Sequence, residues 1–144
     1  MDANESVARA WLEAWNNGKP KVLDTVCAKD YIEYDPAFPE GQADRDGVKR
    51  AIAMYRTAFP DLQFTLQDSI VATDKVAVYW KVSGTNLGEF RGEPPTGKHA
   101  EGEGITIMLM RDGKAVEARS CWDVTSFRQQ AGTLRTPAET AVRN

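Results

Sequence analysis

An aspartate closes the last strand-like run of the chain. Asp123 follows Trp122 at the end of residues 112–123, which read DGKAVEARSCWD. A carboxylate at the end of a mostly apolar strand is costly to bury unless it is paired or used chemically. In an apolar cavity its pKa rises, so the group becomes a stronger base than in water and can exchange protons with a substrate. The alternative is a helix cap, in which Asp123 accepts hydrogen bonds from the backbone N–H groups that follow it.

The strand period sets which side chains accompany Asp123. Alternation places Glu117, Arg119, Cys121 and Asp123 on one face, and the opposite face then carries Val116, Ala118, Ser120 and Trp122. If the first face lines a pocket, Arg119 is suited to anchor a substrate carboxylate or to polarise a carbonyl. The alternative for Arg119 is an ion pair with Glu117 or Glu101 at the rim. Cys121 is a candidate pocket residue, but no histidine partner for a nucleophilic thiol is in view.

Three further polar residues are candidates for substrate contact. Tyr34 and Asp35 end a short strand before Pro36. The Tyr34 hydroxyl is suited either to donate to a substrate oxygen or to bond a backbone group in the core. Asp35 is a candidate second acid, a residue that orients Tyr34, or the cap of a turn. Asn86 either holds a substrate carbonyl or shapes the loop after Gly84.

Aromatic residues supply the candidates for a pocket wall. These are Trp11, Trp15, Tyr55, Phe59, Trp80 and Trp122, joined by the non-aromatic Met54, and plain core packing is the alternative for each of them. The sole histidine, His99, follows a PTGK loop, and the sequence holds no carboxylate cluster. This pattern argues against a zinc or iron site.

The order of elements around these residues predicts the fold class. Helical spacing of apolar residues predicts helices near 2–17, 20–26 and 44–59. A short strand at 31–35 and a loop at 36–44 precede the third helix, and alternation predicts strands near 62–66, 76–82, 100–110 and 115–123. The last two strands form a hairpin around Asp112-Gly113, and a closing helical turn follows at 124–131. Helices followed by long antiparallel strands predict an α+β fold, in which a cone-shaped, curved antiparallel sheet wraps around the N-terminal helices and encloses a pocket.

Length and composition limit the partners. The 144 residues suffice for one domain, expected at 1–132, with a loose tail at 133–144. The net charge of −3 and the lack of a basic stripe argue against nucleic acid. The chain start lacks the pattern of a signal peptide, no apolar run approaches a membrane span, and the two cysteines are expected as free thiols. We therefore expect a soluble cytoplasmic protein, and the apolar alternation on the outer face of the sheet favours a homodimer.

The residues also carry a resemblance to a known family. The segments YDP at 34–36, AFPDLQF at 58–64, GEFRGEPPTGK at 88–98 and DGKAVEARSCWD at 112–123 resemble the SnoaL-like polyketide (ester) cyclases. The resemblance covers most of residues 5–131 and extends to the cone-shaped fold shared by ketosteroid isomerase and nuclear transport factor two. It implies a flat, apolar, oxygen-rich substrate, no metal and no organic cofactor, and it assigns the acid–base role to Asp123. Family members often carry His at the positions of Tyr34 and Asn86 and Trp at that of Arg119, so this chain departs from the family there.

Three functional hypotheses follow. The first is a cofactor-free cyclase that closes a ring in a polyketide-like ester or ketone by an intramolecular aldol step, with Asp123 as acid and base and with Tyr34, Asn86 and Arg119 stabilising the developing negative charge. The second keeps the pocket but opens an epoxide, isomerises a double bond or assists a hydroxylation. The third is a ligand-binding or dimer-forming scaffold without catalysis, which predicts that backbone N–H groups occupy the Asp123 carboxylate and that side chains fill the cavity.

Overall fold

A computed structural model describes residues 2–134 of the chain. The helical part comes first and is interrupted by two strands; it comprises α1 (Ala3–Asn17), a 3-10 turn η1 (Pro20–Val22), α2 (Leu23–Val26), β1 (Cys27–Tyr34), β2 (Gln42–Asp44) and α3 (Arg45–Ala58). The β-rich part follows, with β3 (Gln63–Val71), β4 (Lys75–Thr85), β5 (His99–Arg111), β6 (Lys114–Trp122) and the closing helix α4 (Val124–Gln130). The expected α+β class is confirmed.

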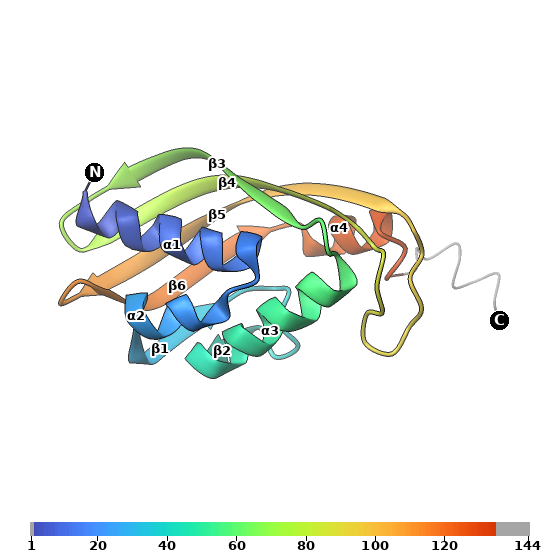
Figure 1. The fold of residues 1–144 in the computed structure, drawn as a ribbon. Helices are drawn as coiled ribbons and strands as arrows, with labels where there is room; N and C mark the ends of the chain where they lie inside the picture. Colours follow the sequence, from blue (N-terminus) through green and yellow to red (C-terminus); the bar gives the residue numbers. More distant parts are fainter. Residues whose placement is uncertain (1, 135–144) are drawn as a thin grey trace.

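The six strands form one curved, unclosed sheet in the order β2-β1-β6-β5-β4-β3 (Figure 1). Neighbours run antiparallel except β1 and β6, which are parallel, so the expectation of an antiparallel sheet is corrected at this pair. Parallel strands need a long crossover between them, and here the whole chain from β2 to β5 supplies it. The crossover puts the end of β1 beside the end of β6, which are the two places where acidic residues follow a strand.

Helices α1, α2 and α3 form a layer on one side of the sheet (Figure 1). Helix α1 begins where the Asp2 carboxylate accepts hydrogen bonds from the N–H groups of Asn4 and Glu5, as a helix cap requires. It ends at Gly18, whose φ of 61° is the left-handed conformation that glycine adopts without strain. Its buried residues, Val7, Ala8, Trp11, Leu12, Ala14 and Trp15, face the sheet. Burial of this apolar stripe holds the helix against β3 and β4.

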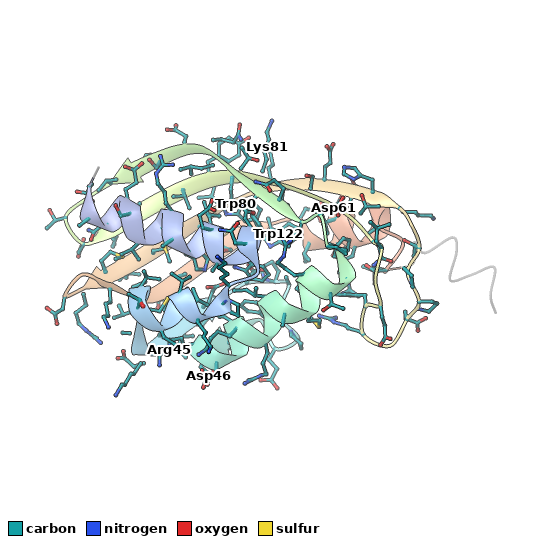
Figure 2. All side chains as sticks on the ribbon, in the orientation of Figure 1. Arg45, Asp46, Asp61, Trp80, Lys81 and Trp122 are labelled. Carbon is teal, nitrogen blue, oxygen red and sulfur yellow. The ribbon has the colours of Figure 1, made fainter. Side chains whose placement is uncertain are left out.

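Alternation along β4 and β6 separates a core face from an outer face. In β4, Val76, Val78, Trp80 and Val82 are buried. Lys81, next to Trp80, points away from the helix layer in Figure 2. In β6, Ala118 and Ser120 are buried, whereas Arg119 and Cys121 are exposed. The period predicted for the last strand is therefore right, but the inward face is the set that contains Trp122.

Two strand boundaries differ from the prediction. Strand β1 begins at Cys27, four residues before the predicted start at Tyr31. Strand β2 lies in the segment predicted as a loop; it is three residues long and pairs only with β1, so it leaves almost no periodic signal. Residues 135–144 of the expected tail lie outside the described residues. None of the described helices is long and apolar enough to cross a membrane.

Candidate active site

A small apolar cavity lies between the helix layer and the sheet. It is lined by residues of α1 and α3, of the β1–β2 loop, of the sheet and of α4, namely Trp11, Trp15, Asp35, Ala37, Phe38, Tyr55, Leu62, Phe64, Trp80, Val82, Trp122 and Phe127. Its volume is about 30 Å³, which is room for roughly one or two water molecules. Asp35 is the one acidic residue of this lining.

Asp35 stands directly after β1 and begins the loop that joins β1 to β2. Its Oδ1 accepts a hydrogen bond from the Ala37 N–H at 2.8 Å and one from the Trp122 indole Nε1–H at 2.9 Å. The first bond is a local turn that Asp before Pro favours, and the second reaches across to β6. The parallel pairing of β1 with β6 makes this second contact feasible. Both of these donors bond Oδ1 of Asp35.

The surroundings of Asp35 make its carboxylate more basic than a solvated one. Burial raises its pKa above the usual range, while hydrogen bonds from Ala37, Trp122 and Ser120 partly offset that rise. The rise follows because a charged carboxylate loses hydration among apolar walls. A group of this kind can hold a proton at a pH where a surface aspartate has lost it, and it can give that proton to a substrate oxygen.

A chain of buried polar groups supports this carboxylate from the sheet. The Trp80 indole N–H donates to Thr106 Oγ1 at 2.9 Å, and Thr106 Oγ1 lies 2.7 Å from Ser120 Oγ. Thr106 and Ser120 are both buried. Buried hydroxyls are costly unless they are hydrogen-bonded, so these bonds satisfy the polar groups on an otherwise apolar face. Ser120 also lowers the pKa of Asp35.

A second carboxyl group, Glu33, lies behind Asp35 on the same face of β1. Glu33 has no exposed surface, and its Oε1 accepts hydrogen bonds from Trp11 Nε1 at 2.8 Å and from the Tyr31 hydroxyl. Its Oε2 is buried without a partner among the described residues. Burial, and to a smaller extent the charge of Asp35, raise the pKa of Glu33 to about 7. The sequence interpretation missed Glu33, although the strand period puts Tyr31, Glu33 and Asp35 on one face.

Five of the six predicted aromatic wall residues line the cavity, whereas Phe59 and Met54 do not. Trp80 packs against Trp122 with ring centroids 5.6 Å apart, and both labels lie between the helices and the sheet in Figure 2. Tyr55 lines the cavity and donates its hydroxyl to the Ala37 carbonyl at 3.1 Å. Trp15 also lines it, and its indole Nε1 is buried without a hydrogen-bond partner among residues 2–134. An unpaired buried donor beside a cavity is available to a ligand oxygen.

Asp123 does not line the cavity. It is exposed and caps α4, where its Oδ1 accepts a hydrogen bond from the Ser126 N–H at 2.9 Å. This is the alternative that the sequence left open, and it places the carboxylate outside the apolar hollow expected of an acid–base residue. The correction has a simple cause: Asp123 lies one residue beyond the inward-facing Trp122, so its side chain points the other way.

The other residues predicted on that face lie on the outside of the sheet. Tyr34 and Arg119 are register partners of the parallel pair, and the Arg119 guanidinium sits over the Tyr34 ring with its Cζ 4.0 Å from the ring centroid. Arg119 also pairs with Glu117, with Nε 3.1 Å from Oε2. Cys121 is an exposed free thiol. None of these four side chains lines the cavity, so the structure separates them from Asp35.

Asn86 and Phe59 are structural in this fold. Asn86 is buried, and its amide group donates to the carbonyls of Ala58 and Gly88 while its Oδ1 accepts from the Thr96 N–H. These bonds close the loop between β4 and β5 and leave little capacity for a ligand. Phe59 is buried behind the cavity wall, against Tyr55 and Phe127. Within residues 2–134, no three His, Cys, Asp or Glu side chains cluster as a metal site requires.

The comparisons with known proteins agree with this architecture. Residues 5–131 match the family model of the SnoaL-like polyketide cyclases. No protein of curated function gives a significant match to the sequence. The chain is similar to TsrD from Streptomyces laurentii, with 27% identity and a TM-score of 0.78 over 93% of this chain and 99% of that one.

Two further solved structures extend the likeness. IdmH from Streptomyces antibioticus, a candidate polyketide cyclase, has 29% identity and a TM-score of 0.75 over 90% of this chain and 98% of that one. AclR from Streptomyces galilaeus, a candidate hydroxylase, shares the fold at 21% identity and a TM-score of 0.77, over 97% of this chain and 87% of its own. Because the family model spans nearly all the described residues, this chain belongs to the SnoaL-like polyketide cyclase family.

Proposed function

We propose that this protein is a cofactor-free cyclase of secondary metabolism that closes a ring in a polyketide-like ketone or ester, with Asp35 as the acid–base group. The observation that carries the proposal is the Asp35 carboxylate in the wall of an apolar cavity, with its pKa raised by burial. Family membership supports the reaction class. The role that the sequence resemblance gave to Asp123 passes to Asp35, because the Asp123 carboxylate is exposed and occupied by a backbone N–H.

The chemistry needs one residue to move one proton twice. The Asp35 carboxylate takes a proton from a carbon next to a carbonyl and leaves an enolate. That carbon forms a bond to a second carbonyl carbon of the same molecule, whose π electrons become an alkoxide. The alkoxide takes the proton back from Asp35, so the enzyme ends in its starting state. We propose that the Trp15 indole N–H, which has no hydrogen-bond partner among residues 2–134, donates to the enolate oxygen.

The cavity has to widen to hold such a substrate. A volume of about 30 Å³ is far below the 300–1,000 Å³ or so of ordinary small-molecule sites. The β1–β2 loop supplies Ala37 and Phe38 to the wall. The Asp35 N–H donates to the Gly41 carbonyl and the Gly41 N–H donates to the Phe38 carbonyl, and these two bonds hold the loop closed. We propose that displacement of this short loop opens the cavity while the Trp122 hydrogen bond keeps Asp35 in place.

The test is deuterium incorporation from D₂O into a panel of polycyclic aromatic ketones and esters with an enolisable CH₂, followed by mass analysis for the cyclised product. Wild-type protein should speed exchange, and Asp35→Asn should lower the rate by about 10²–10⁴-fold. Asp123→Asn is the matched control and should exchange at the wild-type rate. The rate should rise with pH through the raised pKa of Asp35, because the basic form is the active one. Exchange by Asp35→Asn within about threefold of wild type would refute the assignment.

The second candidate function is a non-catalytic binding protein of the same fold. The narrow cavity and the capped carboxylate of Asp123 favour it, since both are features that such a scaffold predicts. If the protein only binds, wild-type protein should bind members of the same panel without speeding their deuterium exchange. The deuterium experiment therefore separates the two functions.

We also propose that the chain forms a homodimer through the outer face of the sheet. Ile105 and Ile107 of β5 are 50% and 45% exposed on that face, and exposed apolar pairs of this kind mark interaction surfaces. Light scattering coupled to size-exclusion chromatography should give twice the chain mass for the wild type. Ile107→Glu should shift the protein toward the monomer. If the wild type still has the mass of a monomer when its concentration is raised about 100-fold, the proposal is contradicted.

A further inference from the structure

Two arginine side chains meet at the aromatic ring of Phe90. The Arg91 Cζ lies 4.9 Å from the ring centroid and the Arg128 Cζ lies 5.2 Å from it. Arg91 comes from the loop between β4 and β5, and Arg128 comes from α4. Two guanidinium groups on one ring repel each other, and both burial and the charge of Arg91 lower the pKa of Arg128.

Neither arginine has an acidic partner among residues 2–134, although the chain as a whole is acidic. The Arg128 Nε is buried without a hydrogen-bond partner in that range. The remaining described bonds go to neutral acceptors: Arg128 Nη2 donates to the Thr133 carbonyl, and Arg91 Nη2 donates to the Ala37 carbonyl, each at 3.4 Å. Two close positive charges with a buried unused donor are chemically suited to bind an anion.

This pair adjoins the cavity wall. The Ala37 carbonyl that accepts from Arg91 also accepts from the Tyr55 hydroxyl, and both Ala37 and Tyr55 line the cavity. The Phe90 ring packs on Tyr55 with centroids 5.4 Å apart. The charges of Arg91 and Arg128 both act on the Tyr55 hydroxyl and lower its pKa against the rise that burial causes. The two guanidinium groups therefore lie within electrostatic reach of the cavity wall.

We propose that Arg91 and Arg128 together bind an oxyanion, a carboxylate or a phosphate, carried by the small-molecule ligand whose apolar part enters the cavity. Guanidinium groups suit this task because their planar donors match the oxygen pairs of carboxylates and phosphates. The proposal deepens the proposed function and rests on it only in that the cavity receives the rest of the ligand. Such a site selects acidic or phosphorylated ring compounds over their neutral analogues.

The experiment uses binding alone, so its result is independent of catalysis. The four tryptophans at the cavity report binding of 2-naphthoate and of the neutral 2-naphthamide by fluorescence. Wild-type protein should bind the carboxylate about tenfold more tightly than the amide, and Arg91→Gln/Arg128→Gln should remove this preference. Arg111→Gln is the control and should keep the preference. Arg111 ends β5 and pairs with Asp30, and the β5–β6 turn lies at the opposite end of the sheet from the β4–β5 loop that carries Arg91 (Figure 1). Equal binding of both probes by the wild type would overturn the proposal.

A second measurement does not need the cavity to open. The Nε–H resonance of Arg128 is followed in ¹⁵N NMR spectra during titration with sodium acetate and, separately, with inorganic phosphate. A saturable shift with either anion, lost in Arg91→Gln, supports the site, and the stronger anion identifies the carboxylate or the phosphate source. The absence of a shift with both anions overturns it.

If Asp35→Asn still binds the anion but no longer catalyses deuterium exchange, both the anion site and the cyclase function are supported. Intact anion binding in a wild type that catalyses no exchange would retain the anion site and reject the cyclase. A wild type that catalyses exchange but binds no anion would retain the cyclase and reject the anion site.

Discussion

Strands β1 and β6 run side by side, and carboxylates on the two faces of this pair lie in opposite environments. On the inner face, Asp35 is held by the Trp122 indole and lies in the wall of an apolar cavity. On the outer face, Glu117 pairs with Arg119, which in turn covers the Tyr34 ring. Both clusters combine a carboxylate with an aromatic ring, and they are separated only by the thickness of one sheet.

The comparison shows that residue type alone does not select the reactive carboxylate. The outer pair lies at the surface, where water and salt screen the attraction between Glu117 and Arg119. The inner carboxylates have lost their water, which raises the pKa of Asp35 and brings that of Glu33 to about 7. This difference supports the proposal that acid–base chemistry takes place on the inner face.

The largest expected contrast concerns Glu33. Its folded-state pKa of about 7 lies above the ordinary 4.5, so the folded protein holds this proton more tightly than the unfolded chain does. The resulting stabilisation is complete below about pH 4.5 and is lost as the pH rises through about 7, for a total of about 3 kcal/mol. Glu33→Gln keeps an acceptor for Trp11 and Tyr31 but does not titrate, so it should gain stability relative to the wild type over this range.

Urea unfolding of both proteins between pH 4.5 and pH 8 measures this gain. Glu117→Gln, the matched change on the outer face, should differ from the wild type by a constant amount within about 0.5 kcal/mol. A pH-independent difference between wild type and Glu33→Gln would show that the inner face does not hold the proton.

Two glycines of β5 offer a steric version of the same comparison. A Cβ at Gly104 would lie 2.7 Å from atoms of both Trp80 and Trp122, whereas one at Gly102 would meet its nearest neighbour at 3.5 Å. Gly104→Ala should therefore cost about 1–3 kcal/mol of unfolding free energy, because the wall of the cavity cannot yield freely. Gly102→Ala should be neutral or slightly stabilising. Equal unfolding midpoints for the two variants would mean that the tryptophans repack easily.

The cap of α4 separates the structural role of Asp123 from a catalytic one. Asp123→Ala removes the acceptor for the Ser126 N–H and should lower the unfolding free energy by about 1 kcal/mol. Deuterium exchange per folded molecule should stay unchanged. Thermal melting and the deuterium-exchange assay, run on the same samples, distinguish the two roles. If Asp123 were catalytic, Asp123→Ala would lose exchange activity even in its folded fraction.

The smallest effect is expected on the outer face. Arg119→Gln breaks the pair with Glu117 and the contact with the Tyr34 ring, both of which are exposed to solvent. The unfolding free energy should change by about 0.5 kcal/mol, and high salt should remove most of that difference. A loss of ligand binding in this variant would place Arg119 at a site after all.

Much of the architecture is readable in the chain, because each element carries its own local signal. The Asp2 and Gly18 caps, the stripe of Trp11 and Trp15, and the alternation through Trp80 predict α1 and β4 correctly. The sequence could not tell that Asp35, and not Asp123, lies in the cavity wall, because an alternating pattern with polar groups on both faces does not tell which face turns inward. On β6, Arg119 faces solvent, as expected of a charged residue, but the polar Ser120 faces the core.

The amino-acid sequence by itself determined the fold class, the order of helices and strands, and the family, since these depend on periodicity and on local caps. Only the tertiary structure decided that β1 lies parallel to β6, that Asp35 meets Trp122 and that Asp123 caps a helix. The reason is physical: a carboxylate becomes an acid or a base through the water it loses and the charges it meets. Those neighbours come from segments 87 residues apart, as for Asp35 and Trp122, which no local pattern records.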